Sequence, residues 1–189
     1  MTNENPIIAV FGGSFDPPHL GHKEIVQDLL VNGGVGLVIV VPTFHHVLKN
    51  GARASYANRL LMCRRSLGRT FGDRVIVSQV EQRIGDSRTY SVLQDLKGRY
   101  PHAELRLVVG SDIILERQRW YRWDDIQRDF GFIVYDRPGY PVPMATRAPV
   151  PHGDLSSIFI REIVSKGGDL TGLVDPSLIP TIQAIYCRE

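Results

Sequence analysis

Two glycines and two histidines stand close together near the amino terminus, in a segment whose residue types suit phosphate chemistry. Residues 12–22 read Gly-Gly-Ser-Phe-Asp-Pro-Pro-His-Leu-Gly-His. Gly12 and Gly13 carry no Cβ atoms, so their backbone N–H groups can approach a phosphate, and a helix beginning behind them adds the positive end of its dipole. His19 and His22 are three residues apart and share one face of a helix. The spacing predicts that both imidazoles point at one bound phosphoryl group.

Simpler interpretations of this segment are weaker. A Gly-Gly pair by itself is most often a turn, and the two histidines could be capping or surface residues. Here, however, the glycines, Asp16, two prolines that favour a helix start and the paired histidines all follow a strand-like run. The segment is not a P-loop, because it has no Gly-Lys-Ser/Thr, and its spacing differs from the dinucleotide fingerprint G-x-G-x-x-G. We therefore interpret it as a phosphate-binding segment of another type.

The elements that must position this segment alternate between short β-branched runs and helical patterns. Strands that alternate with helices need crossover connections, which favours an α/β fold with an open, doubly wound parallel sheet. In such a sheet, ligands bind beyond the carboxyl ends of the strands. Strands are predicted at residues 7–11, 37–41, 74–78, 105–109 and 130–135, and helices at about 20–31, 56–67, 90–99, 113–119, 123–128, 157–166 and 176–186.

The composition is that of one globular domain. The 189 residues are 43% hydrophobic and 22% charged with a net charge of +2, which argues against a multidomain machine, a disordered chain and a wholesale nucleic-acid or membrane surface. We expect one domain over residues 1–189, with a helical C-terminal part from about 155 and a Pro-rich surface loop or lid at 139–153. The apolar runs are far shorter than a membrane span and the start is unlike a signal peptide, so we expect a cytoplasmic protein. Cys63 and Cys187 suggest neither a zinc site nor a disulfide framework.

Two aromatic or acidic positions near the carboxyl end of the fourth predicted strand could bind parts of a nucleotide. Asp112 could accept two hydrogen bonds from a ribose, or it could be a helix N-cap. Trp120 could stack on a cationic aromatic ring, or it could pack in the core, as we expect for Trp123.

Hydroxyls and arginines elsewhere could meet phosphate oxygens. Ser156 and Ser157 begin a predicted helix with Arg161 one turn later, a combination that suits phosphate, although a Ser-Ser pair is more often only a helix cap. The arginines between residues 53 and 69 make that region locally cationic, and we expect most of them to form a solvated helix face.

Taken together, these motifs resemble those of the HxGH nucleotidylyltransferases. Residues 12–22 look like the signature G-G-[ST]-F-D-P-x-H-x-G-H, and residues 155–161 resemble the family's I-S-S-T-x-[IV]-R helix start, with Ile158 in place of Thr. Within that superfamily the chain is most similar to the bacterial nicotinate-nucleotide adenylyltransferases, over nearly its whole length. That resemblance is carried by Gly110-Ser111-Asp112, Thr89-Tyr90-Ser91, Trp120-Tyr121-Arg122-Trp123 and Arg137-Pro138-Gly139, and Arg59 also matches an arginine that recurs in the family.

The resemblance implies a role for each matching residue. His19 and His22 are implied to be catalytic, as donors to the transition state, and no protein base is needed because a phosphate nucleophile is already ionised. Mg²⁺ is implied as the cofactor, bound through the substrate phosphates rather than by a protein ligand set. The residues implied to bind ATP are Gly12, Gly13, Ser14, Phe15, Gly21, Gly110, Asp112, Ser156, Ser157 and Arg161, and those implied to bind the pyridine nucleotide are Asp16, Lys49, Thr89, Tyr90, Ser91, Trp120 and Arg137.

The reaction implied by the resemblance is adenylyl transfer from ATP to nicotinate mononucleotide, giving nicotinate adenine dinucleotide and pyrophosphate in a step of NAD biosynthesis. ATP and a pyridine mononucleotide are then the expected partners, without nucleic acid or membrane, and a homo-oligomer is left open. Adenylyl or cytidylyl transfer to nicotinamide mononucleotide, phosphopantetheine or a polyol phosphate remains an alternative, as does an inactive nucleotide-binding regulatory protein. Residues 45–49 replace the family's P-P-H-K with an H-x-x-x-K spacing, on which the role of Lys49 depends.

Overall fold

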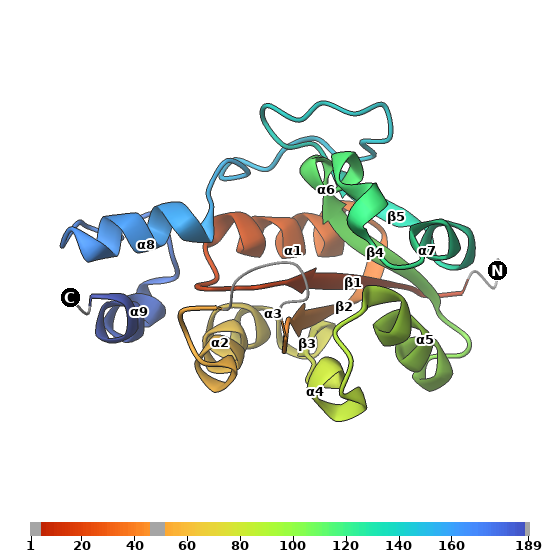
Figure 1. The fold of residues 1–189 in the computed structure, drawn as a ribbon, viewed down its shortest axis with the longest axis horizontal. Helices are drawn as coiled ribbons and strands as arrows, with labels where there is room; N and C mark the ends of the chain where they lie inside the picture. Colours follow the sequence, from red (N-terminus) through yellow and green to blue (C-terminus); the bar gives the residue numbers. More distant parts are fainter. Residues whose placement is uncertain (1–4, 46–51, 188–189) are drawn as a thin grey trace.

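A parallel sheet of five strands forms the centre of the computed structural model, which describes residues 5–45 and 52–187 (Figure 1). The spatial order is β3-β2-β1-β4-β5, and every neighbouring pair is parallel. The order reverses around β1, so the crevice between β1 and β4 is where this fold binds ligands. The predicted α/β fold with an open, doubly wound sheet is confirmed. The strands are β1 (Ile7–Gly13), β2 (Val35–Pro42), β3 (Val75–Val77), β4 (Glu104–Gly110) and β5 (Phe132–Tyr135).

Helices connect the strands and cover both faces of the sheet. The long helix α1 (Leu20–Asn32) follows β1, and α5 (Thr89–Arg99) leads into β4. Short 3₁₀ turns lie at Gly72–Arg74, Arg117–Arg119 and Pro176–Leu178. The other helical elements are α2 (Tyr56–Cys63), a π-helical turn (Arg64–Gly68), α3 (Arg69–Phe71), α4 (Val80–Ile84), α6 (Ser111–Leu115), α7 (Trp123–Asp129), α8 (Ser157–Ser165) and α9 (Ile179–Tyr186).

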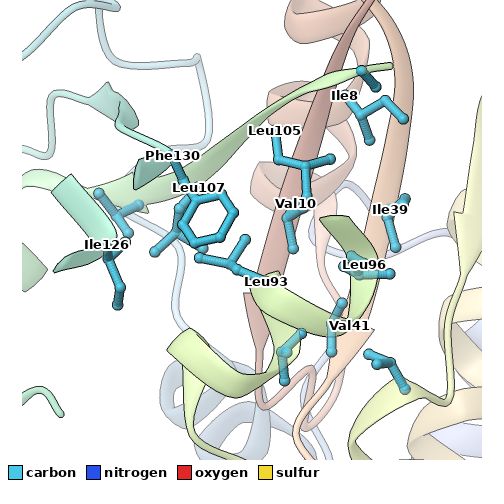
Figure 2. Close-up of a cluster of buried hydrophobic side chains, with 14 of the residues drawn as sticks. Ile8, Val10, Ile39, Val41, Leu93, Leu96, Leu105, Leu107, Ile126 and Phe130 are labelled. Carbon is cyan, nitrogen blue, oxygen red and sulfur yellow. The ribbon is translucent and has the colours of Figure 1, made fainter. Parts of the chain in front are cut away.

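Alternate residues of the central strands face two different core layers, as the two-residue period of a strand requires. Ile8 and Val10 of β1 pack with α5, α6 and α7, whereas Ala9 and Phe11 pack with α1 and the π-helical turn. Full burial of each Ile, Val or Phe side chain among these contributes about 1.5–3 kcal/mol. Figure 2 shows the first layer, where strand residues meet Leu93 and Leu96 of α5, Ile126 of α7 and Phe130.

A third apolar cluster joins the C-terminal helices to α2. Ile160 of α8 and Ile182 of α9 pack in it together with Met62 of α2. Figure 1 shows α8 and α9 next to each other beyond one end of the sheet. The predicted helical C-terminal part therefore shares a core with the rest of the chain, and the two form a single domain.

Several predicted boundaries are corrected by the structure. Gly12 and Gly13 do not form a loop after β1 but end it, because they pair with Val41 and Pro42 of β2. The helix predicted at 113–119 is α6, which begins at Ser111, followed by a 3₁₀ turn. The helix predicted at 56–67 changes to π geometry after Cys63. Helix α4 was not predicted, because five residues are too few to show a helical period.

No helix within the described ranges is both long enough and apolar enough to cross a bilayer.

Candidate active site

The glycine end of β1 is held against β2. The carbonyl oxygen of Gly13 accepts hydrogen bonds from the backbone N–H of Thr43, at 2.9 Å, and from its Oγ1, at 3.1 Å. At Gly13, an added Cβ would lie 3.2 Å from the ring of Phe15. At Gly12 an added Cβ would meet no atom within 4 Å, so this backbone lies open. The end of β1 therefore presents backbone to a space that a ligand can enter.

Phe15, two residues after Gly13, places its ring against that glycine. Phe15 is 1% exposed and adopts a φ of 48°, which is rare and strained for a side chain of its size. Its ring contacts Phe11 edge-on, with centroids 5.5 Å apart, and lies 4.8 Å from the ring of His22. Strained backbone of this kind concentrates at functional sites, where the surrounding packing holds it.

Asp16 anchors this turn to three distant segments. Its buried carboxylate accepts hydrogen bonds from the backbone N–H of Arg53, at 2.9 Å, and of Ala54, at 3.0 Å. It also accepts from the Tyr186 hydroxyl of α9, at 2.6 Å, and an Arg161 nitrogen lies 3.7 Å away. Burial and the Asp16 charge raise the pKa of Tyr186, so this phenol remains a donor. Both carboxylate oxygens are thus engaged inside the protein, and the predicted contact of Asp16 with the pyridine nucleotide stays a prediction.

The rings of His19 and His22 lie close together at the start of α1, tilted by 38° to each other. Their ring centroids are 3.7 Å apart, and the backbone N–H of His19 donates to Nδ1 of His22 at 3.2 Å. Because Nδ1 of His22 accepts, the proton of its neutral ring lies on Nε2. His19 occupies the N-cap position without a side-chain cap bond, and its buried Nδ1 has no hydrogen-bond partner among the described residues. The predicted shared face of the pair is confirmed.

Burial keeps both imidazoles neutral in the free protein. It lowers the pKa of His19 to about 3, with the nearby Arg137 and His152 adding to the effect. It also lowers the pKa of His22 well below its ordinary value, with further contributions from His19 and Arg137. Each neutral ring still carries one N–H that can donate a hydrogen bond, and an anion bound beside the rings would favour their protonated forms.

The Pro-rich segment after β5 lies against the same helix. Glu24 of α1 accepts from the backbone N–H of His152 at 2.7 Å and pairs with its ring. Arg147 pairs with Asp28, one turn further along α1, at 2.7 Å. A Cβ at Gly21 would lie only 2.4 Å from the carbonyl oxygen of His152, so the segment can approach only because residue 21 is glycine. Between residues 139 and 153 the chain has no regular helix or strand, as predicted, and it arches over α1 and α6 in Figure 1.

A cavity of about 470 Å³ opens where β1, β2 and β4 end. It lies at the switch point of the sheet, the expected ligand position in this fold. Neither His19 nor His22 is among the residues that line it, so the prediction that both imidazoles point at a phosphoryl group bound there stays a prediction. Of the residues predicted to bind substrate, its lining contains Gly12, Gly13, Ser14, Thr89, Gly110, Asp112 and Trp120.

Asp112 and Arg137, predicted to bind different substrates, form a pair. The guanidinium of Arg137 lies 2.8 Å from the Asp112 carboxylate, and the Arg137 backbone N–H donates to Ser111 Oγ at 2.8 Å. Helix α6 has Gly110 at its N-cap position, so the alternative that Asp112 is the N-cap is wrong. This leaves a carboxylate at the cavity wall with one cationic neighbour.

The two tryptophans have different environments. Trp123 is buried and stacks on Phe132, with ring centroids 4.4 Å apart, which confirms its predicted packing role. Trp120 is half-buried, meets Trp123 edge-on and lines the cavity. A ring flanked by core on one edge and by the cavity on the other can stack on an aromatic ligand.

The helix that begins at Thr89 brings only part of its predicted motif to the cavity. Thr89 lines the cavity, whereas Tyr90 turns toward α7, where its hydroxyl donates to Asp129 at 3.0 Å. Ser91 bonds Asp86, which lowers the pKa of that carboxyl. The substrate contacts predicted for Tyr90 and Ser91 therefore remain predictions, without cavity positions to support them.

The start of α8 is tied to the turn of residues 14–18, which follows the two glycines and is called the glycine turn here. Ser156 caps the helix by accepting from the Phe159 backbone N–H at 3.1 Å, and Ser157 Oγ donates to the Pro17 carbonyl oxygen at 2.8 Å. Arg161 donates to the Asp16 carbonyl oxygen at 2.6 Å. These side chains are used within the fold, so their contact with ATP stays a prediction.

Lys49, predicted to reach the pyridine nucleotide, lies outside the described residues.

Two residues that hold loops beside the cavity are not marked by their local sequence pattern. Arg59 lies in the segment expected to be mostly a solvated helix face, but it is 2% exposed and donates to the carbonyl oxygens of Ser14, at 2.8 Å, and Thr43, at 2.7 Å. It thereby clamps the loops that follow β1 and β2. Glu81 of the unpredicted helix α4 is buried at the cavity wall. Neither residue has a local pattern that marks burial, although Arg59 matches an arginine that recurs in the resembled family.

Comparison with known proteins agrees with this geometry. A family model described as cytidylyltransferase-like matches residues 10–163. A probable nicotinate-nucleotide adenylyltransferase of Anaeromyxobacter dehalogenans is 35% identical over 181 residues, which cover 94% of each chain. The chain belongs to the nicotinate-nucleotide adenylyltransferase family. The nicotinate-nucleotide adenylyltransferase of Bacillus subtilis is 30% identical over 82% of this chain and 84% of its own.

Solved structures share the fold of this nicotinate-nucleotide adenylyltransferase family member. A nicotinic acid mononucleotide adenylyltransferase of Plasmodium falciparum, complexed with NaAD, superposes with a TM-score of 0.79 at 17% identity, covering 97% of this chain and all of that one. A putative nicotinate-nucleotide adenylyltransferase of Vibrio parahaemolyticus superposes with a TM-score of 0.73 at 22% identity, covering 94% of this chain and 98% of that one. The resemblance stated from the motifs is thus confirmed at the level of family and fold.

Proposed function

We propose that this chain transfers the adenylyl group of ATP to nicotinate mononucleotide. The observation that carries the proposal is the close pair of His19 and His22 at the start of α1, the helix that follows β1, whose glycine end lines a cavity together with Trp120. Family membership supports the same reaction, since the similar proteins carry that activity in their names.

The chemistry needs positioning and charge neutralisation. An oxygen of the mononucleotide 5′-phosphate attacks the α-phosphorus of ATP, a new P–O bond forms, and the bond to the β-phosphate breaks as pyrophosphate leaves. Both reactants are anions, and the transition state gathers more charge on its nonbridging oxygens. Donors aimed at those oxygens lower the barrier, and correct in-line placement alone is worth about 7–11 kcal/mol. We assign the donors to the two imidazoles and the backbone at Gly12 and Gly13.

Mg²⁺ fits this site as a companion of the substrates. The described residues contain no group of three or more His, Cys, Asp or Glu side chains placed to hold a metal ion, and the side chains at the start of α1 are the imidazoles of His19 and His22. Mg²⁺ is commonly held by substrate phosphates together with waters. When bound in this way it neutralises charge on the phosphates, and the residues that hold it are those that hold the triphosphate.

Incubation of the purified chain with ATP, Mg²⁺ and one acceptor at a time tests the proposal. Nicotinate mononucleotide is expected to yield equimolar pyrophosphate and dinucleotide, faster than nicotinamide mononucleotide, phosphopantetheine or a polyol phosphate does. Preference for the amide or for another acceptor would reassign the substrate, and the absence of pyrophosphate with every acceptor would favour a regulatory nucleotide-binding protein.

We expect Trp120→Ala to weaken binding of the pyridine nucleotide and to leave ATP binding nearly intact. Loss of one stacking surface costs about 1–3 kcal/mol, which corresponds to a roughly five- to 150-fold rise in the dissociation constant. Titration calorimetry with each substrate separately measures the split. Trp120→Phe, which keeps an aromatic face, is the matched variant and should lose less. Equal losses for both substrates would show that Trp120 acts through core packing with Trp123.

A further inference from the structure

Two loops that border the cavity are joined by a hydrogen-bond network centred on Glu81. The backbone N–H of Phe44, in the loop after β2, donates to Glu81 Oε2 at 2.6 Å. The next backbone N–H, of His45, donates to Ser87 Oγ at 3.0 Å, and Ser87 in turn hydrogen-bonds Glu81. Glu81, Ser87 and His45 all line the cavity. The network thus connects the β2 loop with the loop that precedes α5.

The network lies on the side of the cavity where the pyridine nucleotide is proposed to stack on Trp120. The loop that contains Ser87 leads directly into Thr89, the first residue of α5. Ser87, Thr89 and Trp120 all line the cavity. Figure 1 shows α4 and α5 on the same side of the strands, next to each other along the chain. A shift of either loop would therefore change the shape of the space next to the Trp120 ring.

Glu81 is an unusual residue to bury here. It is 6% exposed, and burial raises its pKa to about 7. The bonds from Ser87 and Phe44 and the charge of Arg59 favour the carboxylate, while Asp86 opposes it. The Tyr56 phenol of α2 is the remaining titratable group whose ionisation Glu81 influences. The three neighbours that favour the carboxylate do not outweigh burial, so the group changes charge close to neutral pH.

The two forms of Glu81 cannot make the same bonds. An ionised carboxylate only accepts, which matches the donors arriving from Phe44 and Ser87. A protonated carboxyl group carries an O–H donor of its own, so the Ser87 hydroxyl must accept from it instead of donating, or one of the two bonds weakens. Hydrogen bonds to a charged group are also roughly twice as strong as neutral ones.

We propose that Glu81 is a positioning residue for the acceptor half of the site, whose ionised carboxylate holds the Phe44–His45 and Ser87 loops in the arrangement that binds nicotinate mononucleotide. This inference rests on the proposed function, and it adds a residue that acts through the two loops rather than by contact with the reacting atoms.

Retaining this carboxylate costs stability, which separates a positioning role from a purely structural one. Because its pKa is raised in the folded state, the folded protein binds more protons than the unfolded chain between about pH 4.5 and 7. The free energy of unfolding therefore falls as the pH rises through that window, and stays lower above it. Glu81→Gln, which mimics the protonated form, should melt at a higher temperature than the wild type at pH 8.5, and the difference should vanish at pH 5.

The experiment compares the wild type with Glu81→Gln between pH 6 and 8.5. The quantity compared is the KM of Glu81→Gln for nicotinate mononucleotide divided by the KM of the wild type at the same pH. This ratio cancels the titration of the substrate's own phosphate. We expect this ratio to be close to one at pH 6 and to rise to about tenfold at pH 8.5, as for the loss of a charge-assisted bond. KM for ATP should change less than twofold. Glu104→Gln, a carboxylate at the opposite end of β4, is the matched control and should give a flat ratio.

A second variant shifts the pH at which KM for nicotinate mononucleotide changes, rather than abolishing the change. Ser87→Ala takes away a hydrogen bond that favours the Glu81 carboxylate, so the pH-dependent step in KM should shift to higher pH. A ratio that is flat with pH, an equal rise in KM for ATP, or an unmoved step in Ser87→Ala would overturn the proposal.

Amide exchange keeps this test independent of the proposed function. In the substrate-free protein at pH 8.5, the N–H groups of Phe44 and His45 should be several-fold less protected in Glu81→Gln than in the wild type. If the wild type shows no turnover but the amide protection in Glu81→Gln falls as expected, the proposed reaction alone is contradicted. Normal turnover with unchanged protection and unchanged KM would contradict the role of Glu81.

Discussion

His22→Ala is expected to lower kcat by about 10²- to 10³-fold while changing KM for either substrate much less. This is the profile of a donor engaged chiefly in the transition state. The ring is held for that purpose, since its Nδ1 accepts the His19 backbone N–H and its face lies against Phe15, 4.8 Å away. The remaining nitrogen, Nε2, carries the proton that can be donated.

Pyrophosphate release under saturating substrates measures this effect. His22→Gln places an amide near the position of Nε2 and should recover part of the loss. His102→Ala removes an exposed histidine before β4 and should leave kcat unchanged. A kcat within about threefold of the wild type for His22→Ala, in a protein with a normal melting temperature, would remove His22 from the mechanism.

Asp16→Ala is expected to lower the free energy of unfolding by about 3–5 kcal/mol, as the loss of one partner from a buried charged network does. The substitution deprives the Arg53 and Ala54 backbone N–H groups and the Tyr186 hydroxyl of their acceptor, and it leaves Arg161 without its nearby carboxylate. The glycine turn, the segment before α2 and the C-terminal helices would all lose a common anchor. KM for both substrates should rise as a consequence.

Urea unfolding of Asp16→Ala and Asp16→Asn provides the measurement. Asparagine keeps one acceptor oxygen, so its loss should be intermediate, about 1–3 kcal/mol. Asp73→Ala, which removes an exposed carboxylate, should change the free energy by no more than about 0.5 kcal/mol. If Asp16→Ala unfolded like this control and raised KM only for the mononucleotide, Asp16 would be a substrate ligand, as the motif resemblance implies.

The amino-acid sequence by itself determined the alternation of strands and helices, the parallel sheet and the pairing of the two histidines. Buried strands such as β1 and β2 are apolar runs, and His19 and His22 share a face because of the helical repeat. These features depend on near neighbours in sequence, so a local pattern contains them. The same holds for the glycines at residues 12 and 13, although only pairing with β2 decided that they end the strand.

Only the tertiary structure decided which polar residues are buried and what they hold. Arg59 and Glu81 look like solvated side chains, but their partners come from Ser14, Thr43 and Phe44, far away in sequence. Trp120 and Trp123 likewise differ only in what packs on them. A polar group is stable in the interior only where donors and acceptors from separate segments converge on it. That convergence is a property of the folded chain, and no run of neighbouring residues records it.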